Sequence, residues 1–182
     1  MRALAGLVLA ALAASPVAAQ PAAPPPPLPQ AVAPGVWLIP GGIPPKRQPD
    51  GNTVVFQGPS GLVVIDTGRH PWHGQAILDF AKARRAPVVA IVNSHWHLDH
   101  VSGDPVLKAA YPHARIYASR AIDEALTGFL ARSAAEAQPY LAPGKLPPET
   151  QEDIRGDLAT IANGQALRPD VPIEASGPRR LA

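Results

Sequence analysis

The chain has 182 residues, 46% of them hydrophobic and 16% charged, which is enough apolar sequence for one domain with a core. Its formal net charge of +2 is too small to indicate a nucleic-acid partner. It contains no cysteine, which excludes disulfides, thiolate metal ligands and cysteine nucleophiles.

The first residues have the layout of a secretory signal peptide. Arg2 gives a positive start, residues 3–14 are apolar, and Val17-Ala18-Ala19 supplies small residues before a cleavage site after Ala19. The apolar run is too short to span a bilayer permanently, and a retained amphipathic or anchoring helix is the alternative. We therefore expect residues 1–19 to be removed and the protein to be exported to a bacterial periplasm, without stable membrane insertion.

Residues 20–34 contain four consecutive prolines, Pro24 to Pro27, and almost no charge. This composition predicts an extended, polyproline-like linker with nothing to pack against. A ligand for a proline-binding domain is the alternative to a plain spacer. The folded domain is expected to begin near Gly35 and to occupy residues 35–182.

Alternating and continuous apolar runs then predict a mixed α/β domain. The runs at 52–57 and 61–66 are separated by Gly58-Pro59-Ser60, which suits an antiparallel hairpin, and the run at 88–92 suits a strand buried on both faces. Strands are predicted at 36–39, 52–57, 61–66, 88–92, 115–117 and 171–175. Helices are predicted at 73–85, 104–110, 119–137 and 149–166, the last interrupted at Gly156.

Four strong metal ligands follow the predicted strand at 88–92: His95, His97, Asp99 and His100. In extended backbone, His95 and His97 leave the same face and can share an ion, while Asp99 and His100 can turn toward a second ion. Imidazole nitrogen and carboxylate oxygen are ligands that zinc accepts, and two close ions can activate one water. The alternative is a solvated, histidine-rich loop that binds nothing.

The order of strand, Asp66-Thr67-Gly68, helix, strand and His95-x-His97-x-Asp99-His100 resembles the metallo-β-lactamase superfamily, and Gly103 also matches a glycine common in that family. The resemblance runs from about Gly35 to the C-terminus. It implies a four-layer αββα sandwich with a metal site at the edge between two sheets. A looser likeness extends to exported zinc metallohydrolases associated with quinoprotein systems.

The resemblance also implies roles for single residues. His95 and His97 would ligate a first zinc ion, and Asp99 and His100 a second, with Asp99 also orienting or deprotonating the attacking water. Asp66 would accept hydrogen bonds that fix the motif loop, and a simple cap at the end of a strand is its alternative.

Several other side chains are left with two interpretations. Trp37 and Trp96 either line an apolar pocket or, as we expect, pack in the core or on the surface. His70 and His73 either face the site or belong to an ordinary polar loop and helix start. His113 lies in the wrong place for a further zinc ligand, so we expect it on the surface.

The family completes its metal site with further ligands downstream, so the resemblance implies that residues 35–182 are the N-terminal half of the domain, with the C-terminal half missing. We expect an exported zinc-dependent hydrolase, in which metal-activated water attacks an ester, lactam, thioester or phosphoester bond of a small-molecule substrate. The alternative is a truncated, catalytically inactive metal-binding product. A periplasmic metal carrier is a third hypothesis. Substrate identity and oligomeric state are not indicated.

Overall fold

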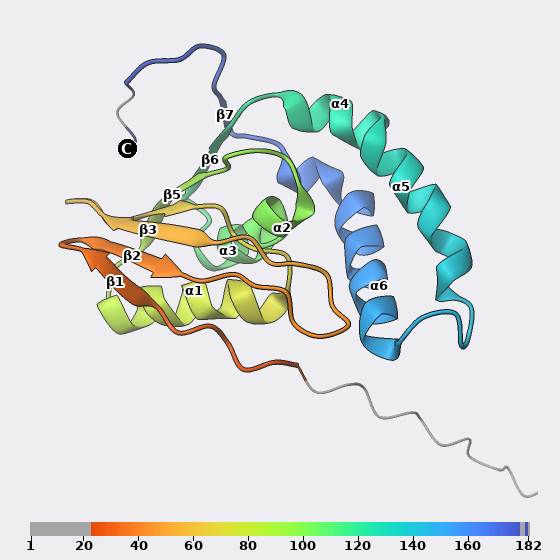
Figure 1. The fold of residues 1–182 in the computed structure, drawn as a ribbon. Coiled ribbons are helices and arrows are strands. Elements are labelled where there is room, and N and C mark those ends of the chain that lie inside the picture. Colours follow the sequence, from red (N-terminus) through yellow and green to blue (C-terminus); the bar gives the residue numbers. More distant parts are fainter. Residues whose placement is uncertain (1–22, 179–180, 182) are drawn as a thin grey trace, which may run out of the picture.

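The computed structural model describes residues 23–178 and residue 181 (Figure 1). The predicted signal peptide, residues 1–19, lies outside this part of the chain. Among the described residues, none of the helices has the length and apolar character that crossing a membrane requires.

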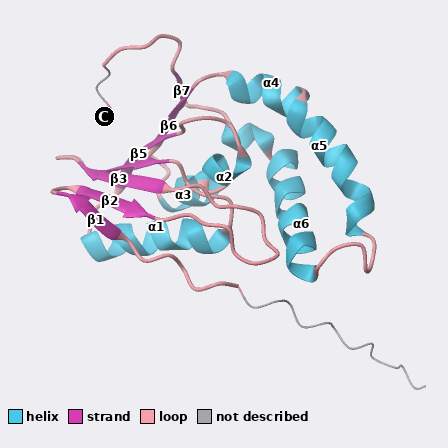
Figure 2. Cartoon of the chain, viewed as in Figure 1, coloured by secondary structure: helices cyan, strands magenta, loops and turns pink. Residues whose placement is uncertain are grey.

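The strands form one seven-stranded sheet whose spatial order follows the chain (Figure 2). The first four strands are antiparallel neighbours, whereas β4 to β7 run parallel. The strands are β1 Gln30–Ala33, β2 Val36–Ile39, β3 Thr53–Gln57, β4 Leu62–Ile65, β5 Val88–Val92, β6 Arg115–Ala118 and β7 Val171–Pro172.

Helices make the crossovers between the parallel strands, as right-handed β–α–β connections require. The α-helices are α1 Pro71–Arg84, α2 Leu98–Val101, α3 Asp104–Ala110, α4 Ala121–Thr127, α5 Phe129–Ala137 and α6 Pro148–Ala162. Two 3₁₀ turns, η1 Gln138–Leu141 and η2 Gly164–Leu167, follow α5 and α6.

The helix α1 has clear start and stop signals. Pro71 occupies its first turn, where a missing N–H costs nothing, and Lys82 and Arg84 place cations in the last turn. Arg85 ends the helix in the left-handed conformation, with its N–H directed to the carbonyl oxygens of Ala81 and Lys82. The helix therefore stops where the chain must turn back into β5.

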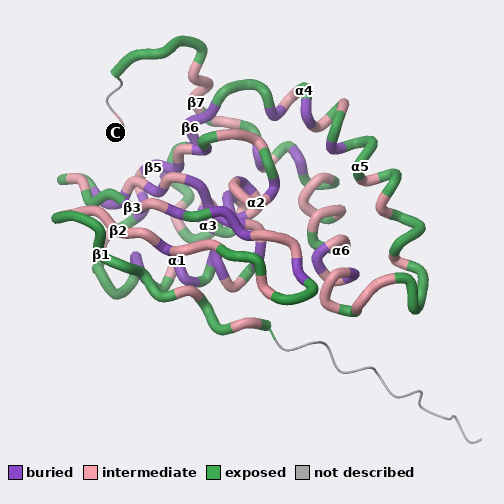
Figure 3. The backbone as a smooth tube through the Cα atoms, viewed as in Figure 1, coloured by how far each residue is buried: buried purple, intermediate pink, exposed green. Residues whose placement is uncertain are grey.

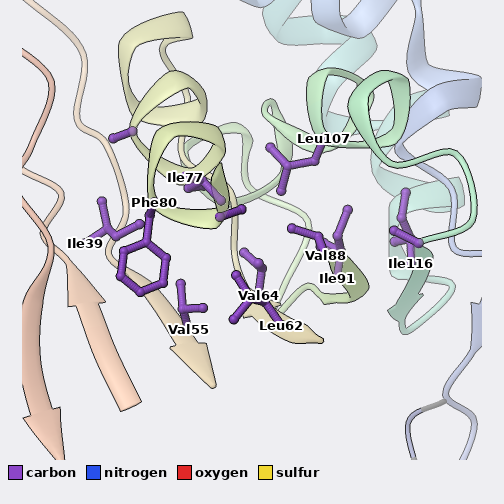
Figure 4. Close-up of a cluster of buried hydrophobic side chains, with 13 residues drawn as sticks. Ile39, Val55, Leu62, Val64, Ile77, Phe80, Val88, Ile91, Leu107 and Ile116 are labelled. Carbon is purple, nitrogen blue, oxygen red and sulfur yellow. The ribbon is translucent and has the colours of Figure 1, made fainter. Parts of the chain in front are cut away.

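The main core lies between one face of the sheet and the helices α1 and α3 (Figure 4). Ile77 of α1 and Leu107 of α3 are almost fully buried against Val55, Val64 and Ile91 of the three central strands. Fully burying one such side chain contributes about 1.5–3 kcal/mol. This contact anchors the strands whose ends carry the motif residues.

The opposite face of the same strands is more open. Val54 pairs with Ile65, and Phe56 pairs with Val63, so these four side chains share the face turned away from α1. Three of them are half-buried, and Phe56 is exposed. A second sheet, as in the predicted four-layer sandwich, is not among the elements of residues 23–178.

The helices α4, α5 and α6 form an arm beside the sheet, next to α2 (Figure 1). A second buried cluster joins this arm to the motif, with Leu98 and Val101 of α2 packed with Ile122, Leu130 and Leu167. The outward residues of α5 are mostly exposed (Figure 3). The arm therefore contacts the rest of the domain through α2 and through ion pairs of α6 with Arg47 and Arg69.

The structure differs from the predicted elements at four places. The sheet begins before Gly35, because Gln30–Ala33 pairs with β2 inside the range expected to be a linker. The helix predicted at 119–137 is broken at Gly128. In contrast, α6 continues through Gly156. Packing of other α6 residues, such as Ile161 against the second buried cluster, compensates for the weak helix propensity of glycine. Leu98–Val101 was expected to be a loop and is a helix.

Candidate metal centre and the cavity beside it

The motif lies where two parallel strands end side by side. Asp66 directly follows β4, Ser94 to Trp96 form a bend shortly after β5, and His97 precedes α2. The carboxyl ends of neighbouring parallel strands meet at one edge of a sheet, which is the usual position for a site in such folds. Asp99 and His100 lie in the first turn of α2 rather than in a loop.

Asp66 accepts three hydrogen bonds that hold the motif in place. Its Oδ1 accepts from the backbone N–H of Ser94 at 2.7 Å, and its Oδ2 accepts from Ser94 Oγ at 2.7 Å and from His100 Nδ1 at 2.8 Å. Its own backbone has a positive φ of 60°, which for a residue other than glycine marks a turn held by its surroundings. Asp66 thus determines the orientation of the His100 ring.

The turn after Asp66 also contacts the far end of the motif. The backbone N–H of Thr67 donates to the carbonyl oxygen of His100 at 2.7 Å. A Cβ atom at Gly103 would lie only 2.3 Å from the carbonyl oxygen of Thr67, so only glycine permits this approach. The close packing of Gly103 against Thr67 therefore explains why a glycine occupies this position.

The four predicted ligand residues are close together. The ring centroids of His95 and His97 are 4.6 Å apart, and those of His95 and His100 are 4.1 Å apart. Nε2 of His100 is 3.2 Å from Oδ2 of Asp99. Burial, followed by the charges of His100 and His97, lowers the pKa of His95 and so favours the neutral imidazole that binds metals.

The donor chemistry of this group fits zinc, but its arrangement is incomplete. In residues 23–178, no three His, Asp or Glu side chains are placed so that they could hold one ion. Both ring nitrogens of His100 face carboxylates: Nδ1 faces Asp66 and Nε2 faces Asp99. A structural or catalytic zinc ion normally has at least three protein ligands, so the motif supplies part of a site rather than a preformed one.

A loop from the antiparallel half of the sheet supports the motif from one side. The backbone N–H of Gly51 donates to the carbonyl oxygen of Asp99 at 2.9 Å. Asp50 accepts from the backbone N–H groups of Arg69 and His70 and from the His70 ring, whose Nδ1 is 2.6 Å away. These hydrogen bonds outweigh the effect of burial and lower the pKa of Asp50.

The remaining histidines do not join the motif cluster. His70 and His73 are 5% and 1% exposed, so both are structural groups of the loop and helix start. Nε2 of His73 is 2.8 Å from Thr53 Oγ1, and burial lowers the pKa of its imidazole. His113 is exposed, as predicted.

A cavity of about 470 Å³ opens beside the motif. His97, Asp99 and Trp96 line it on the motif side, and α5 and α6 line it on the other. Trp96 packs against the cluster around Leu98, as expected, and it also lines this cavity. Trp37 packs against Phe80 at a centroid distance of 5.2 Å. Sequence reasoning missed this cavity because it depends on how two separate helices face each other.

The model of the metallo-beta-lactamase superfamily matches residues 47–177. This match spans most of the chain, so the chain belongs to the metallo-beta-lactamase superfamily, as the motif predicted. The mixed α/β class with its sheet and flanking helices is the fold of that family. At the coarse level the chain is a member of a hydrolase superfamily.

The chain matches only part of the length of each curated relative. A hydroxyacylglutathione hydrolase from Synechococcus sp. (strain JA-3-3Ab) is 32% identical over 59% of this chain, which corresponds to 34% of the relative. An (R)-specific secondary-alkylsulfatase from Pseudomonas sp. is 33% identical over 47% of this chain and 13% of the relative. The chain thus spans about a third of the first of these relatives and less of the second.

Solved structures show the same partial overlap. A metallo-beta-lactamase from Cronobacter sakazakii, a mutant of its HARLDQ motif, is 32% identical with a TM-score of 0.40, over 56% of this chain and 38% of that one. The metallo-beta-lactamase FIM-1 from Pseudomonas aeruginosa, in its mono-zinc form, is 20% identical with a TM-score of 0.45, over 56% and 45%.

Proposed function

We propose that this chain carries the zinc-binding motif of an exported hydrolase that cleaves an ester, lactam, thioester or phosphoester bond in a small molecule. The observation that carries the proposal is the gathering of His95, His97, Asp99 and His100 at one edge of the sheet, beside a cavity. Export is proposed from the residue pattern of the first 19 residues alone.

The residues that would hold zinc are His95 and His97 for one ion and Asp99 and His100 for another. When bound, zinc lowers the pKa of its water toward neutrality and stabilises negative charge on the oxygen of the attacked group. Since residues 23–178 do not place three ligands around one ion, a bound zinc ion would take its remaining ligands from water or from another copy in an assembly.

Asp66, Asp99 and the cavity of this chain would each contribute to that reaction. Asp66 holds His100 through Nδ1, which leaves Nε2 as the only nitrogen that can bind a metal. The Asp99 carboxylate, 20% exposed, can orient the attacking water or accept its proton. The cavity beside His97 and Asp99 can hold a part of the substrate adjacent to the bond that is cleaved.

Zinc retention by the full chain tests the proposal. After dialysis we expect about one or two zinc ions per folded chain and little in His97→Ala or Asp99→Ala. His113→Ala is the matched control, because it removes an exposed histidine outside the motif. The same proteins are then assayed with a chromogenic ester, lactam, thioester and phosphoester.

Unchanged zinc content in His97→Ala would sink the assignment of the motif. A wild-type chain that binds zinc but cleaves none of the four substrates would favour the second function, a metal-binding product without catalysis. That second candidate is supported by the incomplete ligand arrangement of residues 23–178.

A further inference from the structure

The cavity beside the motif lies between two helix faces that match in spacing. On α5 four of the six lining residues, Leu130, Ser133, Ala134 and Ala137, are at positions i, i+3, i+4 and i+7, and Phe129 and Glu136 also line the cavity. Residues at this spacing form one continuous stripe along a helix. The same spacing recurs on α6, where the lining residues are Ile154, Asp157, Leu158 and Ile161.

Two helices that face each other with such stripes ordinarily close on each other by side-chain interdigitation. Here three of the four residues in the α5 stripe are serine or alanine, which are too small to reach the opposite helix. The space left is about 470 Å³, within the range of about 300–1,000 Å³ that is typical of small-molecule pockets. The small side chains of α5 therefore create the cavity.

The floor of the cavity is the motif itself. Trp96, His97, Leu98 and Asp99 all line it. The Trp96 ring stands perpendicular to the His97 ring, at a centroid distance of 4.5 Å. A group bound between α5 and α6 would lie directly beside two of the predicted zinc ligands.

Large apolar side chains remain exposed at the rim. Phe129 is 55% and Tyr140 is 54% exposed, and both line the cavity at the two ends of α5. Phe129 approaches Trp96 with a centroid distance of 5.5 Å. Exposed aromatic side chains around a hollow are characteristic of a surface that binds an apolar group.

The charges of the lining disfavour an anionic ligand group. The guanidinium of Arg69, which among residues 23–178 is the only Lys or Arg side chain that lines this cavity, forms an ion pair with Asp157, so its charge is already balanced. The carboxylate of Glu136, which is not one of the proposed zinc ligands, also lines the cavity and would repel an anionic tail. An aliphatic chain or a phenyl ring avoids this repulsion.

We propose that the cavity between α5 and α6 binds an uncharged hydrophobic group of the substrate, an alkyl chain or a phenyl ring adjacent to the bond that is cleaved. This inference rests on the proposed function for the cleaved bond, but the binding of the group itself needs no catalysis. The substrate class is therefore hydrophobic esters, thioesters or lactams with neutral side groups.

Binding of unreactive amides tests the cavity without hydrolysis. The full chain carries 5-fluorotryptophan, and Trp96→Phe assigns the fluorine resonance of Trp96. Hexanamide and phenylacetamide should shift that resonance and bind at least about tenfold more tightly than acetamide, because they bury more apolar surface. Equal affinities for the three amides would overturn the inference.

Two neighbouring alanines of α5 provide a matched pair of variants. Ala134 lines the cavity, whereas Ala135 is exposed on the outer side of the same helix. Ala134→Leu should weaken hexanamide and phenylacetamide binding at least about tenfold by filling the space, and Ala135→Leu should leave it unchanged. The same effect from both variants would contradict the proposal.

A rim variant keeps the test valid if Ala134→Leu fails to fold. Tyr140→Ser changes an exposed side chain, so it should preserve the fold while weakening phenylacetamide binding.

Hydrolysis by the zinc-loaded chain is a separate measurement. Wild type and Ala135→Leu should cleave 4-nitrophenyl hexanoate faster than 4-nitrophenyl acetate. Selective amide binding without any cleavage would support the cavity and reject the proposed hydrolase, so the two failures are distinguishable.

Discussion

Asp104 is a fully buried carboxyl group between the turn after β4 and the end of β5. Its oxygens accept hydrogen bonds from Thr67 Oγ1 at 2.9 Å and Asn93 Nδ2 at 2.6 Å. Burial raises the pKa of Asp104 from 3.8 to about 7, and the nearby charges of Asp66 and Asp170 act in the same direction. The folded chain therefore keeps this proton at pH values where the unfolded chain has lost it.

The raised pKa predicts a loss of stability as pH increases. Below about pH 4 both states are protonated, and from about pH 4 to 7 the folded state is destabilised by up to about 1.4 kcal/mol per pH unit. Asp104→Asn should flatten this part of the pH profile, and the Asn93 Oδ1, which has no hydrogen-bond partner within residues 23–178, can accept from the new amide. Chemical denaturation at several pH values measures the effect. Asp79→Asn, an exposed carboxyl on α1, is the control, and identical profiles for wild type and Asp104→Asn would refute the assignment.

At the scale of elements, the proline segment before β1 behaves differently from a free linker. Pro24 and Pro27 are half-buried, while Pro25 and Pro26 are exposed. A spacing of three residues is one turn of a polyproline II helix, and each of the first three prolines precedes another proline, which favours this conformation. Pro24 lines two hollows together with Trp72 of α1, and Pro26 and Pro25 each line one of them. The segment thus lies beside an aromatic ring, with Pro24 and Pro27 as its more buried members.

This packing predicts that the four prolines are unequal. Pro24→Ala with Pro27→Ala should loosen the segment and speed hydrogen exchange of the backbone amides of β1, which follows directly. The control is Pro25→Ala with Pro26→Ala, which replaces two exposed prolines. Both double variants remove two proline rings, so both raise the conformational entropy of the unfolded chain by the same amount. Hydrogen exchange followed by mass spectrometry compares the two. Equal acceleration in both double variants would mean that the segment is a plain spacer.

Local patterns were sufficient to predict most strands and the ends of α1. The hairpin of β3 and β4 and the strand β5 were predicted because β-branched runs bounded by glycine and proline have few alternatives. The break at Gly128 was missed, since apolar spacing continues through it on both sides. The helix α2 was missed because only four residues form it and its carbonyl groups at Asp99 and His100 accept hydrogen bonds from Gly51 and Thr67, far away in the chain.

The candidate site, too, was only partly predictable from the local sequence. The spacing of His95, His97, Asp99 and His100 and the turn at Asp66 identified the motif, because these residue types after a strand have a specific chemistry. Nothing in the local sequence indicated that Gly51 and Asp50 would support Asp99 and His70 from another part of the chain. The role of Ala134 was equally hidden, since a cavity between α5 and α6 is a property of their packing.

For the whole molecule, the two faces of the sheet have different surroundings. The face toward α1 and α3 is closed, with Val55 and Val64 fully buried. The other face carries Val54, Phe56, Val63 and Ile65, and in residues 23–178 no second sheet covers it. In the four-layer sandwich implied by the family, each sheet buries its apolar face on the other. The chain therefore presents an apolar surface next to the antiparallel half of its sheet.

This open face predicts strong binding of an apolar dye such as anilinonaphthalene sulfonate by the folded chain. Phe56→Thr should lower the dye fluorescence severalfold while keeping β propensity, because it removes the largest exposed side chain of the face. Val106→Thr is the control, since Val106 on α3 is 43% exposed against 42% for Phe56 but lies away from the face. If Phe56→Thr and Val106→Thr lowered the fluorescence equally, the dye would be reporting scattered apolar residues and not this face. A reduction confined to Phe56→Thr, with unchanged circular dichroism, would show that the surface available to a second layer is open in solution.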